Sequence, residues 1–202
     1  PEVVAYIDKL GQNIAKYMGR DEFEYEFNVI DDEGINAFAL PGGKVFVNTG
    51  AILAANSEAE LAGLLAHEIS HAVLSHGFER IMTNNLLANL SREIPLGDIL
   101  GTLVSLSYSR DKERQADLIG ARVLNSTGYA ADGLRNFMVT LSQEGGSRAP
   151  AILSSHPAPP GRGTRGAVRY GVRSGLTRGG SRSRLRGVAW RGWAGLNPGV
   201  DR

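Results

Sequence analysis

The sequence predicts one α+β domain in which a short sheet precedes most of the helices. Apolar residues recur with helical spacing over residues 2–18, and again over several segments that follow residue 57. Residues 23–30, by contrast, alternate apolar and polar side chains, as a half-buried strand does. With 202 residues, of which 42% are hydrophobic, the chain is long enough to bury one core.

The N-terminal part is expected to hold a helix followed by three strands. Residues 2–18 present one apolar face, and residues 23–30 form the first predicted strand. The segments "INAFAL" (35–40) and "KVFVNT" (44–49) predict two more strands, and the Pro-Gly-Gly between them favours a tight hairpin. We therefore expect a small antiparallel sheet before the first long helix.

The C-terminal part is expected to be mostly helical. Ser57 and Glu60 form a capping box for a helix that runs to about His76, where Gly77 can adopt the left-handed conformation that closes a helix. The segment "ILSSHPAPPGR" (152–162) is rich in proline and is expected to be non-helical. Further helices are expected at residues 78–90, at 110–127 with Ser109 as the cap and Gly128 closing it, and at 130–144, with another apolar stretch at 99–108.

The composition excludes thiolate chemistry. The chain has no cysteine, so it can form no disulfide, and any metal ion must be held by His, Asp or Glu. No run of about 18 apolar residues occurs, so we do not expect this piece to span a membrane. Its first residue is Pro1, so we expect it to be a processed or cut piece of a longer protein.

The segment "HEISH", residues 67–71, carries the strongest chemical signal. Residues four apart share a helix face, so His67 and His71 can converge on one metal ion. Glu68 lies one position along, outside the plane of the ligands but beside a water bound to the metal. Two ligands and a neighbouring general base make up the HExxH pattern of zinc peptidases. The alternative is a pair of core-facing histidines with ordinary hydrogen bonds.

A catalytic zinc needs a third protein ligand, and a second predicted helix offers one. "SRDKERQAD" supplies Glu113, with Asp117 four residues later on the same face. Asp117 can accept a hydrogen bond from the non-coordinating nitrogen of a ligand histidine and so fix its tautomer. Without the first motif, this stretch would be interpreted as a solvated charged face. Glu79 and Glu93 are weaker candidates for the third ligand.

Three other features suit a peptidase. His156 could stabilise the oxyanion of the tetrahedral intermediate or approach the metal when no substrate is bound, although an exposed loop histidine is the alternative. The strand at 44–49 could be a free edge that binds an extended peptide by strand addition. His76 lies five residues past His71, off the ligand face, so we expect it to cap or pack rather than to coordinate.

These segments, in this order and spacing, resemble the gluzincin zinc metallopeptidases of peptidase family forty-eight. That family includes HtpX-like heat-shock proteases, prenyl-protein (CAAX) proteases and periplasmic BepA-like proteases. The resemblance spans about residues 1–162, and its matching stretches are "INAFALPGGKVFVNTGAIL", "ELAGLLAHEISHAVLSHG", "YSRDKERQADLIGARVL" and "SSHPAPPGR". It implies a zincin-like α+β catalytic domain with an HExxH active-site helix.

The resemblance also implies roles for single residues. Glu68 would be the catalytic base, His156 the active-site histidine of a His-Pro motif, and Asp117 a partner of a ligand histidine. One Zn²⁺ ion per chain would be held by His67, His71 and Glu113. The substrate side would include Asn36 and Ala37 of the Asn-Ala-Phe motif, and Arg162 downstream of the His-Pro motif.

Residues 163–202 differ from the rest of the chain and from the family pattern. They contain ten Gly, nine Arg, no Lys and one acidic residue, a charge balance of +8 against −7 for residues 1–162. A basic Gly/Arg tail could bind nucleic acid, whereas arginine without lysine suggests translation out of frame. Either origin predicts a largely disordered tail. We therefore expect a catalytic domain at 1–162, without nucleic-acid binding, and a separate tail at 163–202.

The function expected from the sequence is a zinc endopeptidase that acts on unfolded or extended protein segments. The resemblance implies an exported bacterial protein, periplasmic or associated with the envelope, that serves protein quality control there. Its expected partners are protein or peptide substrates, among them proteins associated with membranes. The alternative is a zinc-binding but latent chaperone or adaptor, whose site stays capped. Substrate preference and oligomeric state do not follow from the sequence.

Overall fold

The computed structural model describes residues 2–19, 23–77, 79, 107–144 and 151–156. Glu93, Arg162, the predicted helix at 78–90 and the tail at 163–202 lie wholly or almost wholly outside these residues. The elements are α1 (Glu2–Ala15), β1 (Glu26–Ile30), β2 (Ala37–Ala39), β3 (Lys44–Asn48), α2 (Thr49–Ala54), α3 (Glu58–Val73), α7 (Arg110–Thr127), α8 (Gly133–Glu144) and α9 (Ala151–Ser155). A short sheet followed mostly by helices confirms the α+β class, and α2 is a helix that the sequence patterns did not predict.

The sheet is mixed rather than antiparallel throughout. Its strand order is β1-β3-β2, with β2 antiparallel to β3 and β1 parallel to β3. The predicted hairpin is therefore correct, but the hairpin places β3 between the other two strands. Since β1 and β2 run in opposite directions, a strand antiparallel to β2 must run parallel to β1. The expectation that residues 44–49 form a free edge is wrong, because β3 is central and β2 lies at the edge.

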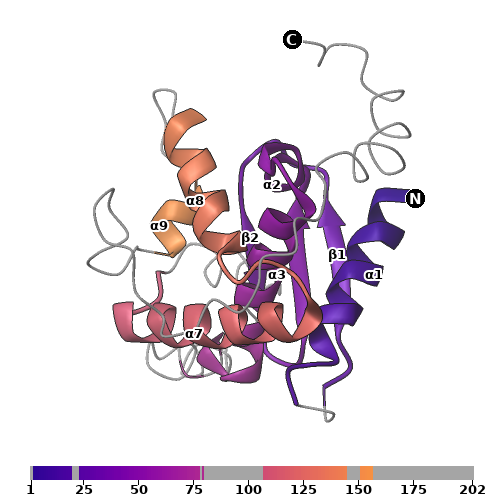
Figure 1. Cartoon of the computed structure of the whole chain (residues 1–202), viewed down its shortest axis with the longest axis vertical. Helices are drawn as coiled ribbons and strands as arrows, with labels where there is room; N and C mark the ends of the chain where they lie inside the picture. The colour runs from indigo at the N-terminus through magenta and orange to yellow at the C-terminus, as the bar shows by residue number, and fades with distance from the viewer. Residues whose placement is uncertain (1, 20–22, 78, 80–106, 145–150, 157–202) are drawn as a thin grey trace, which may run out of the picture. The chain divides into compact units, whose positions relative to one another are not determined.

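Helix α3 is the central element of the described fold. It packs against α1, β2, β3, α7 and α8, and Figure 1 shows α1 and β1 on one side of it and α8 and α9 on the other. Its residues are buried almost all round, Leu64, Leu65 and Ile69 completely, as expected of a helix enclosed by other elements. The HExxH residues therefore lie in a closely packed part of the fold that is shielded from solvent.

Both predicted N-cap residues, Ser57 and Ser109, are confirmed. Ser57 accepts a hydrogen bond from the backbone N–H of Glu60, and Ser109 accepts one from that of Lys112, as N-cap side chains do. Gly128 ends α7 in the left-handed conformation, at φ 82°. The capping signals in the sequence thus set the bounds of α7 to within one residue.

The end of α3 differs from the prediction. The helix stops at Val73, and the left-handed residue is Ser75, at φ 55°, rather than Gly77. The chain then turns back into a helical conformation at His76. A left-handed non-glycine residue costs of the order of 1 kcal/mol, which the surrounding contacts of His76 must offset.

Two close helix contacts determine how near the neighbouring helices approach α3. A Cβ atom on Gly120 of α7 would lie 3.3 Å from the backbone nitrogen of His67. A Cβ atom on Gly63 would overlap the backbone nitrogen of Leu134 at the start of α8. Glycine at these crossings lets the helix backbones touch, and the contact at Gly120 brings the preceding turns of α7 onto the HExxH face.

The segment around His156 is also more regular than predicted. Residues Ala151–Ser155 form the short helix α9, and His156 N–H donates to the Ile152 carbonyl at 3.0 Å. The prolines begin only at Pro157, and a proline disfavours helical conformation in the residue before it, so they end the helix rather than prevent it. None of the described helices is long and apolar enough to cross a membrane.

Candidate metal centre

Helix α3 places His67 and His71 one turn apart on its buried face. Their Nε2 atoms lie 3.0 Å apart, and each residue is 1% exposed. Two imidazoles that present nitrogen lone pairs to the same point need a shared proton or a cation between them. This is the arrangement that i, i+4 spacing predicted for the HExxH helix.

Two further side chains reach the same point from α7 and from the end of α9. Glu113 Oε1 lies 3.3 Å from His71 Nε2, and Glu113 Oε2 lies 3.5 Å from His67 Nε2. His156 Nδ1 lies 3.0 Å from Glu113 Oε1 and 3.2 Å from His67 Nε2. All four residues are buried, and one ligand atom from each lies within 4.8 Å of the others.

This cluster of His67, His71, Glu113 and His156 fits a zinc ion. Zinc–nitrogen and zinc–oxygen bonds of about 2.0–2.1 Å in a tetrahedron put neighbouring ligand atoms about 3.3 Å apart, and the separations above are 3.0–3.5 Å. The donors are nitrogen and carboxylate oxygen, which zinc accepts. The coordination set therefore suits a divalent transition metal better than calcium or magnesium, which prefer oxygen.

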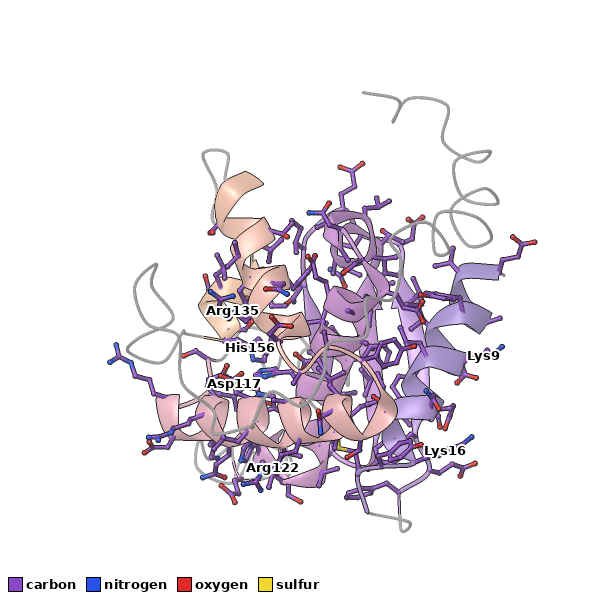
Figure 2. The ribbon with its side chains drawn as sticks, viewed as in Figure 1. Lys9, Lys16, Asp117, Arg122, Arg135 and His156 are labelled. Carbon is purple, nitrogen blue, oxygen red and sulfur yellow. The ribbon has the colours of Figure 1, made fainter. Side chains whose placement is uncertain are left out.

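Asp117 lies behind His67, as its position four residues after Glu113 predicted. Its Oδ1 atom is 3.1 Å from His67 Nδ1, the nitrogen that faces away from the cluster. Burial lowers the pKa of His67, but hydrogen bonds to Asp117 and Glu113 outweigh it and raise the pKa to about 10. Asp117 and Glu113 thus stabilise a positive charge at His67, whether it is carried by a proton on the ring or by a bound metal ion. Asp117 and His156 thus contact opposite nitrogens of His67, and Figure 2 labels both of them, together with Arg122 on the outer side of α7.

Glu113 is held as a carboxylate by its surroundings. Burial alone would raise its pKa, but hydrogen bonds to His156, His67 and His71 lower the pKa far below the ordinary value. For His71, burial dominates and lowers the pKa well below that of a free imidazole. An anionic Glu113 and a neutral His71 are the protonation states that metal ligation requires.

Glu68 lies beside the cluster without belonging to it. It is completely buried, and its Oε1 atom is 3.5 Å from His156 Nε2. Neither of its oxygens accepts a hydrogen bond of ordinary geometry from the described residues. Burial raises the pKa of Glu68, and the nearby His156, His67 and the Ala39 backbone act in the opposite direction. A buried carboxylate with a raised pKa is suited to take up a proton.

The remaining sequence candidates lie outside the cluster. Glu79 forms a 2.8 Å ion pair with Lys112 at the surface. His76 is buried and contacts His71 on the side away from the cluster, with 3.0 Å between the two Nδ1 atoms. Among the described alternatives, Glu113 is therefore the carboxylate that reaches both ligand histidines.

Asn36 and Ala37 lie at the start of the edge strand β2. Asn36 is buried, and its carbonyl accepts from Asn48 N–H, while Leu40 N–H donates to the Lys44 carbonyl. Backbone groups alternate in an antiparallel pair, so those of Ala37 and Ala39 point away from β3. The outer edge of β2 thus presents backbone groups, and that of Ala39 lies next to Glu68.

Tyr108 is a site residue that sequence reasoning missed. Its ring stacks on His71, with centroids 4.0 Å apart and planes inclined by 19°. Its backbone N–H donates to the Ser155 carbonyl at 3.1 Å, which ties the start of α7 to α9. The residue stands directly before the cap Ser109, so its position at the entrance of the Glu113 helix was the available signal.

The sequence is similar to those of several known proteins. The model of peptidase family M48 matches residues 1–164. A "Beta-barrel assembly-enhancing protease" of Yersinia pestis is 30% identical over 183 positions, which cover 80% of this chain and 38% of that protein. The "Mitochondrial metalloendopeptidase OMA1" of Arabidopsis thaliana is 34% identical over 141 positions, covering 66% of this chain and 29% of that protein.

A third relative is similar over a larger share of its own length. The "Metalloprotease YcaL" of Escherichia coli K12 is 30% identical over 160 positions, which cover 71% of this chain and 62% of that protein. This chain thus spans under two fifths of the Yersinia protease. Since the family model covers most of the residues, and the buried His-His-Glu-His cluster is intact, the chain belongs to peptidase family M48.

Proposed function

We propose that this protein is a zinc-dependent endopeptidase that cleaves unfolded or extended protein segments. The observation that carries the proposal is the buried convergence of His67, His71 and Glu113 with Glu68 directly beside them. A site that only stabilised the fold would not need a buried carboxylate next to its ligands, because burying that group costs free energy. The metal would be zinc, one ion per chain.

Each residue would have a separate task. The bound ion would supply Lewis acidity, polarising the scissile carbonyl and making a water molecule more acidic. Glu68 would accept the proton of the attacking water and pass it to the leaving amine, for which its raised pKa prepares it. Asp117 would hold His67 with its Nε2 lone pair directed to the metal.

The position of His156 supports a resting state in which the site is capped. Catalytic zinc sites keep one position open, whereas structural sites are filled by four protein ligands. His156 Nδ1 lies as close to Glu113 and His67 as a fourth ligand would. We propose that His156 withdraws when a substrate carbonyl arrives and then stabilises the oxyanion. The second candidate function is a latent chaperone or adaptor. The contact of His156 with Glu113 and His67 favours it too, because it fills the fourth position.

The edge of β2 would bind the substrate backbone. Ala37 and Ala39 direct their backbone groups away from β3, so an extended peptide could pair with them as an added strand beside Glu68. Recognition through the backbone suits unfolded segments of varied sequence. Asn36 would position this strand, and Arg162 is proposed to act on the substrate side as well.

The biological setting is proposed from the relatives. One relative is named a beta-barrel assembly-enhancing protease, which supports a role in envelope protein quality control. An exported, periplasmic or envelope-associated location, with membrane-associated proteins among the substrates, would follow from that role. For residues 163–202, nucleic-acid binding and out-of-frame translation are both retained as hypotheses.

The test compares zinc-loaded wild type with Glu68→Gln at equal zinc content, using unfolded casein as substrate. We expect the wild type to cleave, a chelator to stop it, and the variant to lose at least about 100-fold in kcat/KM, the lower range for a general base. His156→Ala serves as the second arm. If the wild type does not cleave casein but His156→Ala does, the site is capped but competent. If neither the wild type nor His156→Ala cleaves, although each holds one zinc, the latent module is the better interpretation.

A further inference from the structure

His76 contacts the side of His71 that faces away from the cluster. The left-handed Ser75 turns the chain so that His76 points back under α3, where it is 2% exposed. Its Nδ1 atom lies 3.0 Å from His71 Nδ1, and its Nε2 atom lies 3.4 Å from Gln115 Oε1 on α7. The three side chains form a line from the candidate metal centre into α7.

The protons along this line can be assigned from the metal side outward. His71 Nε2 faces the cluster, so it must keep its lone pair to bind a metal, and the ring proton then lies on Nδ1. His71 Nδ1–H can donate only if His76 Nδ1 accepts, which places the proton of His76 on Nε2. That proton is then directed at Gln115 Oε1, an acceptor. All three groups are satisfied by a single assignment.

The surroundings of His76 support this assignment. His76 is buried, and its Nε2 atom faces Gln115 Oε1 at 3.4 Å, so Nδ1 is the ring nitrogen left to accept from His71. Tyr108 stacks on the face of His71, so the ring is held on its face by Tyr108 and along its edge by His76.

We propose that His76, held by Gln115, is a positioning residue that fixes the tautomer and ring orientation of His71. Asp117 has the corresponding place behind His67, so each α3 histidine has its own outer partner, a carboxylate for one and a neutral imidazole for the other. The neutral partner orients His71 without adding a fourth carboxylate to Glu68, Glu113 and Asp117. The inference rests on the proposed metal site and deepens it.

The test measures zinc affinity by competition with a chromophoric chelator at neutral pH. Loss of an outer partner of a metal ligand typically weakens binding about 10–100-fold, and we expect this for His76→Phe. His76→Asn should restore most of the affinity, because Asn Oδ1 can occupy nearly the same place as Nδ1 and can accept. Glu79→Gln is the matched control: it breaks the exposed Lys112 ion pair in the same junction and should leave affinity unchanged.

A second measurement reads the tautomers directly. Long-range ¹H–¹⁵N spectra of the zinc-loaded protein should show His76 protonated on Nε2 and His71 on Nδ1. A His76 proton on Nδ1, or equal zinc affinity for wild type and His76→Phe, overturns the inference. Equal weakening by Phe and Asn, with matching loss of metal-free stability, also overturns it by showing a packing role.

The outcomes separate this inference from the proposed function. If the wild type binds no zinc, both fail. If it binds zinc with the expected dependence on His76 but cleaves nothing, the endopeptidase proposal fails and the positioning role stands.

Discussion

Two buried glutamates on the same helix have opposite surroundings. Glu60, near the start of α3, accepts hydrogen bonds from Asn56 N–H at 2.9 Å and from the Thr140 hydroxyl at 3.2 Å. Glu68, two turns later, is completely buried, and the described residues give its oxygens no hydrogen bond of ordinary geometry. A buried carboxylate costs free energy unless it is hydrogen-bonded. The first end of α3 thus stabilises the fold, and the second end keeps a reactive group.

The same contrast extends to the neighbours of each end. At the first end, the Tyr129 hydroxyl donates to Glu58 at 2.6 Å, and acidic groups in the first turn interact favourably with the helix dipole. At the second end, acceptors of His67, His71 and Glu113 crowd around one point. Polar groups that pair one to one indicate structure, whereas several metal-ligating groups directed at one point indicate a place for a ligand.

The largest expected difference is between Glu113→Gln and Glu60→Gln. We expect Glu113→Gln to weaken zinc binding by more than the about 10–100-fold caused by losing an outer partner, because it removes the anionic ligand itself. Activity should fall with the zinc content. We expect Glu60→Gln to keep zinc and activity while losing about 1 kcal/mol of stability through a weaker cap. Zinc titration and urea unfolding measure the two effects. Loss of zinc binding in Glu60→Gln would contradict a purely structural role for Glu60.

Removing the metal should affect only the C-terminal end of α3, where the candidate metal centre lies. At a free zinc concentration about 1,000 times Kd, binding stabilises the folded state by about 4 kcal/mol, and a chelator should remove that increment. The same increment is expected for Glu60→Gln, starting from a lower baseline, because its zinc site is unchanged. Thermal unfolding with and without chelator checks both proteins. A wild type equally stable in both conditions would contradict a metal-bound centre.

The smallest effect is expected for Tyr129→Phe, which removes the hydrogen bond to Glu58. Burial, followed by the bond to Glu58, raises the pKa of the Tyr129 hydroxyl well above its ordinary value of about 10. Such a group stabilises the fold fully below the unfolded pKa and loses that contribution as pH rises above it. We therefore expect a cost of about 1 kcal/mol at pH 8 that shrinks above pH 10. Urea unfolding at several pH values checks this, and a cost that grows with pH would contradict it.

Several expectations from the sequence were confirmed because they depend on short distances along the chain. The caps Ser57 and Ser109 lie next to the turns they satisfy. His67 and His71 share a face because a helix repeats every 3.6 residues. The resemblance to peptidase family forty-eight was also correct, since motif order and spacing carry it. The individual roles of the site residues remain predictions.

The corrections concern contacts between segments far apart in sequence. Alternation identified three strands, but it could not show that β3 would lie between the other two and parallel to β1. The glycine signal predicted that α3 runs to about His76 and closes at Gly77, whereas packing put the left-handed turn at Ser75 and His76 against His71. The prolines suggested an irregular segment, and α9 formed just before them.

The sequence by itself determined which residues are chemically capable and which helix carries most of them. Only the tertiary structure decided that Glu113 reaches both histidines, that His156 closes the fourth side, and that Tyr108 stacks on His71. Local rules describe hydrogen bonds and side-chain faces within a few residues. Convergence across α3, α7 and α9 depends instead on how closely their backbones pack, which glycines such as Gly120 permit.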